Sequence, residues 1–318
     1  MQIKNSFTLS GLALAMLTLA APSMADDSQT SAPAYFAPSE VRGQVVYAKD
    51  CAACHGENGN GAGPGAGPLD PKPRDFTSGL YKFRSTTYGE LPTDADLLRV
   101  VNEGVAHSQM PPWKNVLSEQ EKVDVIAYIK GFSPDFKDTS SHLDTIVIPE
   151  APPSTPELVQ EGRQIYMTME CWACHGVEGK GNGSSAGSLT DNWGNPIRPA
   201  NFTWEHYKRG NSPEDIYKTI NTGLNGTPMI SFAGAFLFGG DRQIDSATQT
   251  SFSAGEIQGL EAYLKAQPTD AQIGAMPQDQ KNQLDQKRKW ALVYYLHSLV
   301  RSPNVFEWLF TQDMELTH

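Results

Sequence analysis

The apolar positions of the chain fall into short segments with the spacing of amphipathic helices. In the first segment, Val41, Val45 and Val46 predict an apolar stripe along a helix. Ser39 is a good N-cap residue, so this helix is expected to begin there and to run to about Lys49.

Two further helices are predicted in the first half of the chain. One opens at Thr93, carries several apolar residues at helical spacing and closes at Gly104. The other opens at Ser118, where Glu121 three residues later completes a capping-box pattern, and it ends at Gly131. These elements predict a mostly helical domain.

The second half of the chain repeats the order of the first half. The matching pairs, separated by 119 or 120 residues, are Gly43 and Gly162, Tyr47 and Tyr166, Cys51 and Cys171, Asn102 and Asn221, Gly104 and Gly223, and Met110 and Met229. A fixed offset at several separated positions indicates an internal duplication. The expected fold class is therefore all-α, with two helical domains of one kind in tandem.

Composition places the boundaries between these domains. The first domain is expected at 38–132, and the Pro-, Ser-, Thr- and Asp-rich stretch 133–156 is a predicted linker. The second domain is expected at 157–301, and it is longer because of a predicted insertion at about 237–286.

Two segments could form the last helix of the second domain. Ser253 to Lys265 copies the capping box and apolar pattern of the helix that opens at Ser118. Lys287 to Val300 is more apolar and is the preferred candidate. The first of these segments would then be a helix of the insertion.

The N-terminus has the pattern of a secretory signal. An apolar run from Leu9 to Ala21 is too short to cross a bilayer, and Ser23-Met24-Ala25 is a small-x-small cleavage signal. We expect residues 1–25 to be a cleaved signal peptide, with an uncleaved anchor as the alternative. No later segment is apolar for long enough to span a membrane, so the mature chain is expected in the periplasm without a transmembrane span.

Charge narrows the class of partner. The formal net charge is −11, and it becomes −12 when the signal peptide and its one charged residue, Lys4, are removed. An acidic surface argues against a nucleic-acid partner and favours a protein with a basic docking face.

The strongest chemical signal is a five-residue motif that occurs twice, as Cys51-Ala52-Ala53-Cys54-His55 and as Cys171-Trp172-Ala173-Cys174-His175. This C-x-x-C-H spacing is the attachment signature of haem c: the two thiols bond to the porphyrin and the histidine binds its iron. The four cysteines of the chain are all used. A zinc site would need four converging ligands and a thioredoxin-like dithiol a βαβ context, and neither needs the histidine. The sequence therefore predicts two haem c groups, attached at Cys51, Cys54, Cys171 and Cys174.

Each iron then needs a second axial ligand opposite His55 or His175. Met110 lies 55 residues after His55, and Met229 lies 54 residues after His175. Both methionines stand beside a proline, which stiffens the loop that would hold the sulfur. Equal placement in the two copies makes them the predicted ligands, whereas His107 has no counterpart in the second copy.

With these motifs the chain resembles a tandem dihaem class I c-type cytochrome, over about 38–132 and 157–236 and one late helix. The resemblance implies that the first and last helices of each domain cross at a contact between a glycine and an aromatic residue. Gly43 with Tyr128 would fill these places in the first domain, and Gly162 with Tyr295 or Tyr263 in the second.

Three other residues are of interest near the predicted haems. Arg74 and Arg198 could contact haem propionates, because arginine pairs well with carboxylates, although a solvated loop position suits each of them equally. Trp172 replaces Ala52 inside the second motif, so the edges of the two haems need not be equivalent.

Histidine and methionine together fill both axial positions of the iron, which favours electron transfer over catalysis. We therefore expect a non-enzymatic electron carrier of the respiratory chain or the cytochrome subunit of an oxidoreductase, with a membrane or periplasmic oxidoreductase, an oxidase or a small carrier as its redox partner. One alternative is a dihaem enzyme with catalysis at one haem, either a peroxidase or a sulfur-compound dehydrogenase. Another is a docking module in which the insertion at 237–286 binds a partner and the haems relay electrons.

Overall fold

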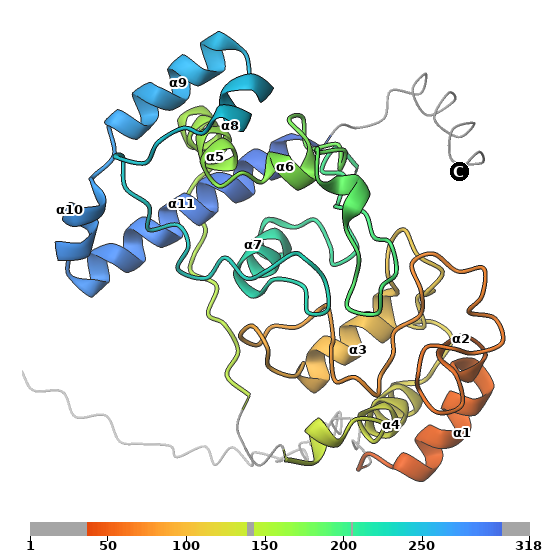
Figure 1. Ribbon diagram of the computed structural model, residues 1–318. Helices are drawn as coiled ribbons and strands as arrows, with labels where there is room; N and C mark the ends of the chain where they lie inside the picture. Colours follow the sequence, from red (N-terminus) through yellow and green to blue (C-terminus); the bar gives the residue numbers. More distant parts are fainter. Residues whose placement is uncertain (1–36, 139–142, 205, 301–318) are drawn as a thin grey trace, which may run out of the picture. The chain divides into compact units, whose positions relative to one another are not determined.

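The computed structural model describes residues 37–138, 143–204 and 206–300 (Figure 1). Within these ranges the chain is helical and its only β-pairing is two isolated bridges, which confirms the expected all-α class. The predicted signal peptide, residues 1–25, lies outside the described ranges. The α-helices are α1 (Glu40–Asp50), α2 (Ala52–His55), α3 (Asp94–Glu103), α4 (Glu119–Lys130), α5 (Pro156–Thr168), α6 (Trp172–His175), α7 (Pro213–Thr222), α8 (Ser246–Ser251), α9 (Ala254–Lys265), α10 (Asp270–Ala275) and α11 (Gln278–Ser298). Two 3₁₀ turns, η1 (Pro134–Asp138) and η2 (Ala186–Ser188), complete the described helical elements.

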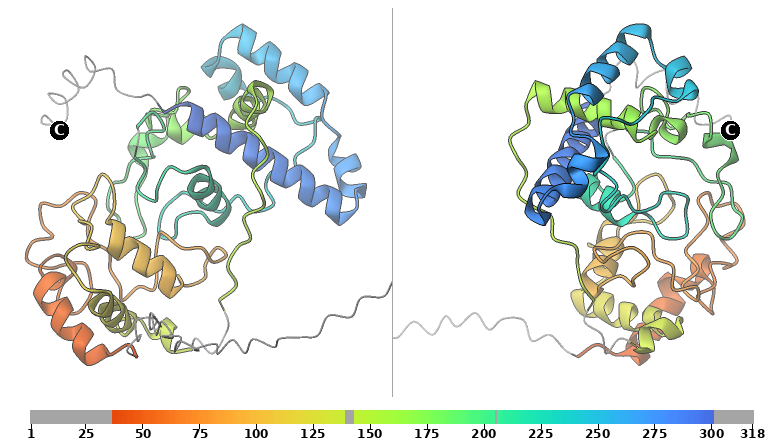
Figure 2. Two further views of the ribbon diagram at one scale, coloured as in Figure 1. Left: turned by 180° about the vertical axis from the view of Figure 1, so that it is seen from behind. Right: turned by 60° about the vertical axis from the view of Figure 1, so that its left-hand side comes forward.

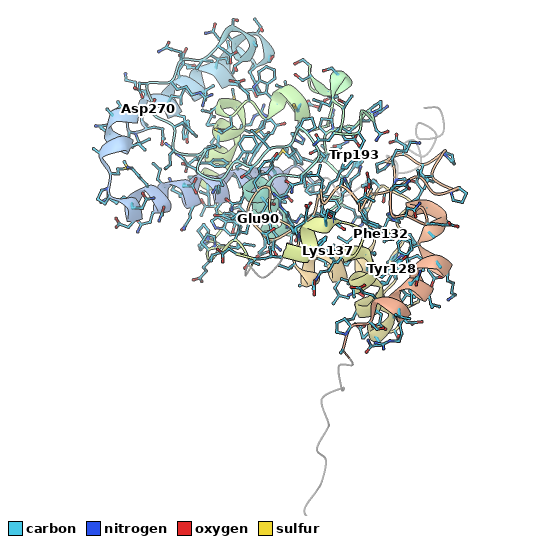
Figure 3. The ribbon with its side chains drawn as sticks, turned by 60° about the horizontal axis from the view of Figure 1, so that its bottom comes forward. Glu90, Tyr128, Phe132, Lys137, Trp193 and Asp270 are labelled. Carbon is cyan, nitrogen blue, oxygen red and sulfur yellow. The ribbon has the colours of Figure 1, made fainter. Side chains whose placement is uncertain are left out.

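Helix α1 crosses α4 at Gly43, as the resemblance implied. A Cβ atom on Gly43 would lie 2.0 Å from the carbonyl oxygen of Asp124 and 2.9 Å from Cβ of Tyr128. Only a glycine permits this approach of two helix backbones. Tyr128 and Phe132, labelled in Figure 3, form an edge-to-face pair beside the crossing, with ring centroids 5.0 Å apart.

The predicted apolar stripe of α1 is wrong in part. Val41 and Val45 are 76% and 69% exposed, while Val46 is buried together with Gly43 and Tyr47. Since the crossing is centred on the glycine, the buried face is the one that carries positions 43, 46 and 47. Val41 and Val45 lie on the opposite side.

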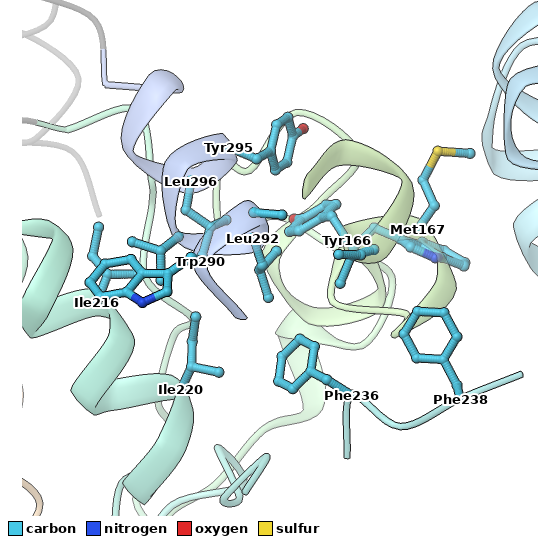
Figure 4. Close-up of a cluster of buried hydrophobic side chains, with 14 of the residues drawn as sticks. Tyr166, Met167, Ile216, Ile220, Phe236, Phe238, Trp290, Leu292, Tyr295 and Leu296 are labelled. Carbon is cyan, nitrogen blue, oxygen red and sulfur yellow. The ribbon is translucent and has the colours of Figure 1, made fainter. Parts of the chain in front are cut away.

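The second domain has the same crossing between α5 and α11. A Cβ atom on Gly162 would lie 2.0 Å from the carbonyl oxygen of Ala291 and 2.6 Å from Cβ of Tyr295. The aromatic partner is therefore Tyr295 and not Tyr263. Figure 4 shows Tyr166 of α5 and Tyr295 of α11 in this buried cluster, and their ring centroids are 5.4 Å apart.

Each domain has its own hydrophobic core. The core of the first domain includes Val46, Tyr47, Phe76, Leu97, Val101, Val125, Ile126 and Ile129. The core of the second domain includes Ile165, Tyr166, Met167, Ile216, Ile220, Phe236, Trp290, Leu292, Val293 and Leu296. Two separate hydrophobic cores agree with two cytochrome-like domains in tandem.

Helix α9 has the capping box that the sequence predicts, with Ser253 and Glu256 bonded reciprocally, but it does not make the close crossing on α5. Figures 1 and 2 show it at the side of the α5–α11 pair. Leu260 and Leu264 on its inner face are nevertheless buried in the core of the second domain. The extra segment is thus packed into this domain and is not a detachable module.

Trp172 packs toward the same extra segment. Its ring stands edge-on to Phe252, which immediately precedes the N-cap of α9, with centroids 5.7 Å apart. The difference between Trp172 and Ala52 therefore accommodates the longer second domain.

Polar contacts join residues of the two domains. The buried Arg84 donates to the carbonyl oxygen of Thr222 at 2.7 Å, and Arg209 donates to the carbonyl oxygen of Arg84. Arg99 forms an ion pair with Asp215 at 2.9 Å. In the described ranges no helix is both long and apolar enough to cross a membrane.

Candidate haem sites

Each C-x-x-C-H motif forms a single helical turn directly after the first helix of its domain. In α2, the amide of His55 donates to the carbonyl oxygen of Cys51 at 2.9 Å, and in α6 the amide of His175 donates to that of Cys171 at 2.9 Å. Cysteines three positions apart on such a turn lie on the same face. The next residue is a glycine with positive φ, 80° at Gly56 and 83° at Gly176, which ends the turn.

The first motif borders a cavity of about 210 Å³. Cys51, Cys54 and His55 lie along it, and so does Met110, although 55 residues of chain separate the histidine from the methionine. Most of the remaining wall is apolar, from α3, α4 and the intervening loops, and includes Leu97, Val101, Trp113, Leu117, Val125, Ile126 and Ile129. The structure thus gathers two thiols, an imidazole and a thioether around one apolar space.

The two histidines are oriented in the same way. Nδ1 of His55 donates to the carbonyl oxygen of Arg74 at 3.0 Å, and Nδ1 of His175 donates to that of Ala200 at 3.0 Å. Because Nδ1 carries the proton, Nε2 keeps its lone pair for a metal. Phe76 and Phe202 stack on these imidazoles, with centroids 4.6 Å and 4.4 Å away.

Burial lowers the pKa of both His55 and His175 below the usual value. Desolvation disfavours the charged imidazolium, so the neutral ring, which is the metal-binding form, is favoured. Burial also raises the pKa of the Cys51 and Cys171 thiols to about 12. A redox-active dithiol needs the opposite shift, toward a reactive thiolate, so the thioredoxin-like alternative loses support.

The methionine loops have the same pattern of hydrogen bonds in the two domains. In the first, the amide of Val105 donates to the carbonyl oxygen of Met110 at 3.0 Å, and the amide of Met110 donates to Ser108 Oγ at 3.2 Å. In the second, Leu224 donates to the carbonyl oxygen of Met229 at 2.8 Å, and Met229 donates to Thr227 Oγ1 at 3.2 Å. Both loops follow a helix that ends at a glycine with positive φ.

The other histidine considered from the sequence lies elsewhere. His107 is exposed on the loop before Met110, where its Nε2 donates to the carbonyl oxygen of His206 at 2.8 Å and its ring lies 4.3 Å from that of Trp204. It contributes to the contact between the domains and is not among the residues that border the cavity.

The two candidate arginines have different surroundings. Arg74 lines the cavity, whereas Arg198 is exposed. In the second domain the carbonyl that accepts the hydrogen bond of the histidine belongs to Ala200, so Ala200 and not Arg198 takes the place of Arg74. Sequence analysis missed two lysines at the same cavity, Lys82 and Lys208. The signal was available, because Tyr81-Lys82 recurs as Tyr207-Lys208 at the offset that relates Pro73 to Pro199.

No group of three or more His, Cys, Asp or Glu side chains that could hold a bare metal ion occurs in the part of the chain that the structure describes. The side chains at the cavity do fit a haem c: two thiols for thioether bonds, two axial donors, an apolar wall, and cationic groups for the carboxylates of the propionates.

Comparison with known proteins gives two family matches, one in each half of the chain. Residues 39–129 match the family of subunit III of cbb3-type cytochrome c oxidase, and residues 159–267 match the cytochrome c family. The second match ends in the loop after α9, although α11 makes the close crossing on α5.

Individual relatives agree with the family matches. The cbb3-type cytochrome c oxidase subunit FixP of Sinorhizobium medicae is 26% identical over 148 residues, and the subunit FixPc of Rhizobium leguminosarum bv. viciae is 27% identical over 139 residues. Each match covers 44% of this chain and 40% of the relative, so the chain spans less than half the length of these oxidase subunits.

A solved structure covers more of the chain. One chain of the Kuenenia stuttgartiensis reducing HAO-like protein complex Kustc0457/Kustc0458 is 36% identical, with a TM-score of 0.63, over 82% of this chain and 96% of that one. From two family matches in tandem, two C-x-x-C-H turns and this extended likeness, the chain belongs to the c-type cytochromes and has two cytochrome c domains.

Proposed function

We propose that this cytochrome carries single electrons between redox proteins in the periplasm, as the cytochrome subunit of an oxidoreductase complex. Haem c supplies the one-electron Fe(III)/Fe(II) couple when it is bound. The chain would hold one haem through Cys51 and Cys54, and the other through Cys171 and Cys174.

The observation that carries this proposal is the cavity that has His55 and Met110 on its walls. The imidazole is held with Nε2 available, and the methionine is held by a loop with two backbone hydrogen bonds. The repeated hydrogen bonds at His175 and Met229 support the same ligand pair in the second domain. With the histidine and the methionine both bound, each iron would have no free coordination position for a substrate.

The relatives support a role within a complex. The curated relatives are oxidase subunits, and the structural relative is part of a reducing HAO-like complex. We assign the first domain to 38–132, the linker to 133–156 and the second domain to 157–301, and we place the extra segment at about 237–286.

Spectroscopy of ligand variants tests the proposal. The oxidised wild-type protein is expected to show a methionine–iron charge-transfer band and two haems per chain in a pyridine haemochrome assay. Met110→Ala and Met229→Ala should each remove about half of that band, because each removes one sulfur ligand. Met276→Ala, at the C-cap of α10, is the matched control and should leave the band unchanged.

Membership of the structural relative in an HAO-like complex makes an enzyme the second candidate function. Catalysis at one haem requires an open or easily displaced sixth ligand. A wild-type protein with a high-spin haem that binds cyanide rapidly would refute the carrier proposal and favour this enzyme.

A further inference from the structure

Three cationic side chains gather at the cavity of the first domain. Arg74, Lys82 and Lys208 all line it, and none of their cationic groups has a hydrogen bond or ion pair with any residue in the described ranges. Desolvation and their mutual repulsion lower the pKa of Lys82 to about 8.

Such a cluster is costly by itself, because like charges near an apolar wall repel one another and are poorly hydrated. The carboxylates of Asp191, Asp75 and Asp70 act on these cations through their charge, and no ion pair joins them within the described residues. A ligand that brings two carboxylates into the cavity would neutralise most of the excess positive charge. The two propionates of a haem have this charge and this chemistry.

One of the three cations comes from the other domain. Lys208 belongs to the second domain, yet it lines the cavity of the first and lowers the pKa of Lys82 by its charge. It is the counterpart of Lys82 in the internal repeat, so the two copies of one lysine lie close together.

A second residue of the second domain contacts the same place. Trp193, labelled in Figure 3, lies under the guanidinium of Arg74, 4.7 Å from its ring centroid, and its Nε1 donates to Asp75 Oδ2 at 3.3 Å. The carbonyl of Arg74 in turn accepts the hydrogen bond of His55. Trp193 is therefore two contacts away from the predicted axial ligand of the first haem.

The turn that presents Trp193 is an addition of the second domain. The offset between the two copies rises from 120 residues at the cysteines to 126 at Pro73 and Pro199, so the second copy has six extra residues between these points. The turn that holds Trp193 lies in this interval and is closed by a hydrogen bond from the amide of Asp191 to the carbonyl oxygen of Asn195, at 2.9 Å.

We propose that the second domain completes the first haem site. Lys208 binds the propionates of the first haem together with Arg74 and Lys82, and Trp193 holds Arg74 in place, so the reduction potential of the first haem depends on side chains of the second domain. This inference rests on the proposed attachment of that haem at Cys51 and Cys54. Lys208 and Trp193 are positioning residues in this scheme.

The test measures the potentials of both haems in Lys208→Gln, with haem-methyl NMR resonances to distinguish them. Loss of a nearby cation stabilises the ferric state, so the first haem should become harder to reduce. We expect its ferric-to-ferrous ratio at a fixed electrode potential to rise about threefold, which is a shift of about 28 mV for a one-electron couple. The potential of the second haem should move less.

Three variants make this result specific. Lys208→Arg keeps the charge and should restore the wild-type potential. Trp193→Leu should lower the potential of the first haem in the same direction, because it releases Arg74. Lys265→Gln, an exposed position of α9 away from the cavity, removes the same charge and should leave both potentials unchanged.

Equal shifts in Lys208→Gln and Lys265→Gln, with circular dichroism and haem content as in the wild type, would overturn the inference. Failure of this inference can be distinguished from failure of the proposed function. A wild-type protein without two haems or without the methionine–iron band contradicts the proposed ligation, whereas intact spectra with an unmoved potential contradict only the role of the second domain.

Discussion

The helix crossing of the second domain makes a quantitative prediction. In Gly162→Ala the new methyl group would lie 2.0 Å from the carbonyl oxygen of Ala291, while ordinary contact begins at 3.4 Å. Helices α5 and α11 would have to separate by about 1.4 Å, because the obstacle is backbone and cannot rotate away.

The expected cost follows from two opposing effects. Overpacking a core typically costs about 1–3 kcal/mol, and a backbone clash lies at the upper end of that range. Alanine recovers up to about 1 kcal/mol through its better helix propensity. We expect Gly162→Ala to lower the free energy of unfolding of the second domain by roughly 2 kcal/mol.

Two matched variants accompany it. Gly43→Ala should destabilise the first domain similarly, because its methyl group would lie 2.0 Å from the carbonyl oxygen of Asp124. Gly259→Ala in α9 should instead stabilise the second domain by about 0.5–1 kcal/mol, since the nearest atom, Gln164 Nε2, would be at an ordinary 3.5 Å.

Differential scanning calorimetry of the haem-loaded protein, supported by circular dichroism, measures these changes. The Gly43 and Gly162 variants together identify which transition belongs to which domain. A neutral Gly162→Ala combined with a destabilising Gly259→Ala would refute the reasoning, because α9 would then be the tightly packed closing helix.

Three further predictions use other contacts. The hydrogen bond from Arg42 lowers the pKa of Asp124 below its usual 3.8. This carboxylate therefore stabilises the fold at neutral pH, and its contribution is lost as the pH falls through the lowered pKa. The unfolding free energy of Asp124→Asn, measured from about pH 7 to about pH 3, should lack this loss. Tyr47→Phe and Tyr166→Phe each remove one of two hydrogen bonds to the buried carbonyl of the glycine after a haem motif, which keeps the amide of Gly59 or Gly179 as a donor; denaturant titration should detect a cost of about 0.5–1.5 kcal/mol in each. Deleting residues 237–286 should prevent the second domain from folding, because the segment supplies part of its core. Helicity and one haem should be lost. A deletion variant that keeps both haems and the full helicity of the remaining chain would contradict this packing.

The last prediction changes how the docking alternative is tested. Removing the insertion cannot separate docking from folding when Leu260 and Leu264 are core residues. Substitution of exposed positions on α9, such as Glu261 or Lys265, leaves the core intact. Partner reduction rates unchanged by such substitutions would count against docking at this face.

Much of this protein is determined by short stretches of sequence. The C-x-x-C-H turns, the helix caps at Ser39, Thr93 and Ser118, and the glycines that end α3 and α7 depend on residues within a few positions of one another, so local physical chemistry predicts them. The internal duplication can also be recognised without a structure, because it is a repeat in the sequence itself.

Tertiary structure decided what local pattern leaves open. Residues 253–265 and 287–300 both read as closing helices, and only the backbone approach of Ala291 to Gly162 selects α11. The buried face of α1 excludes Val41 because the crossing is fixed by Gly43 and its partner on α4. Lys208 and Trp193 reach the cavity of the other domain through contacts more than a hundred residues apart in sequence, and such contacts depend on how the two domains pack.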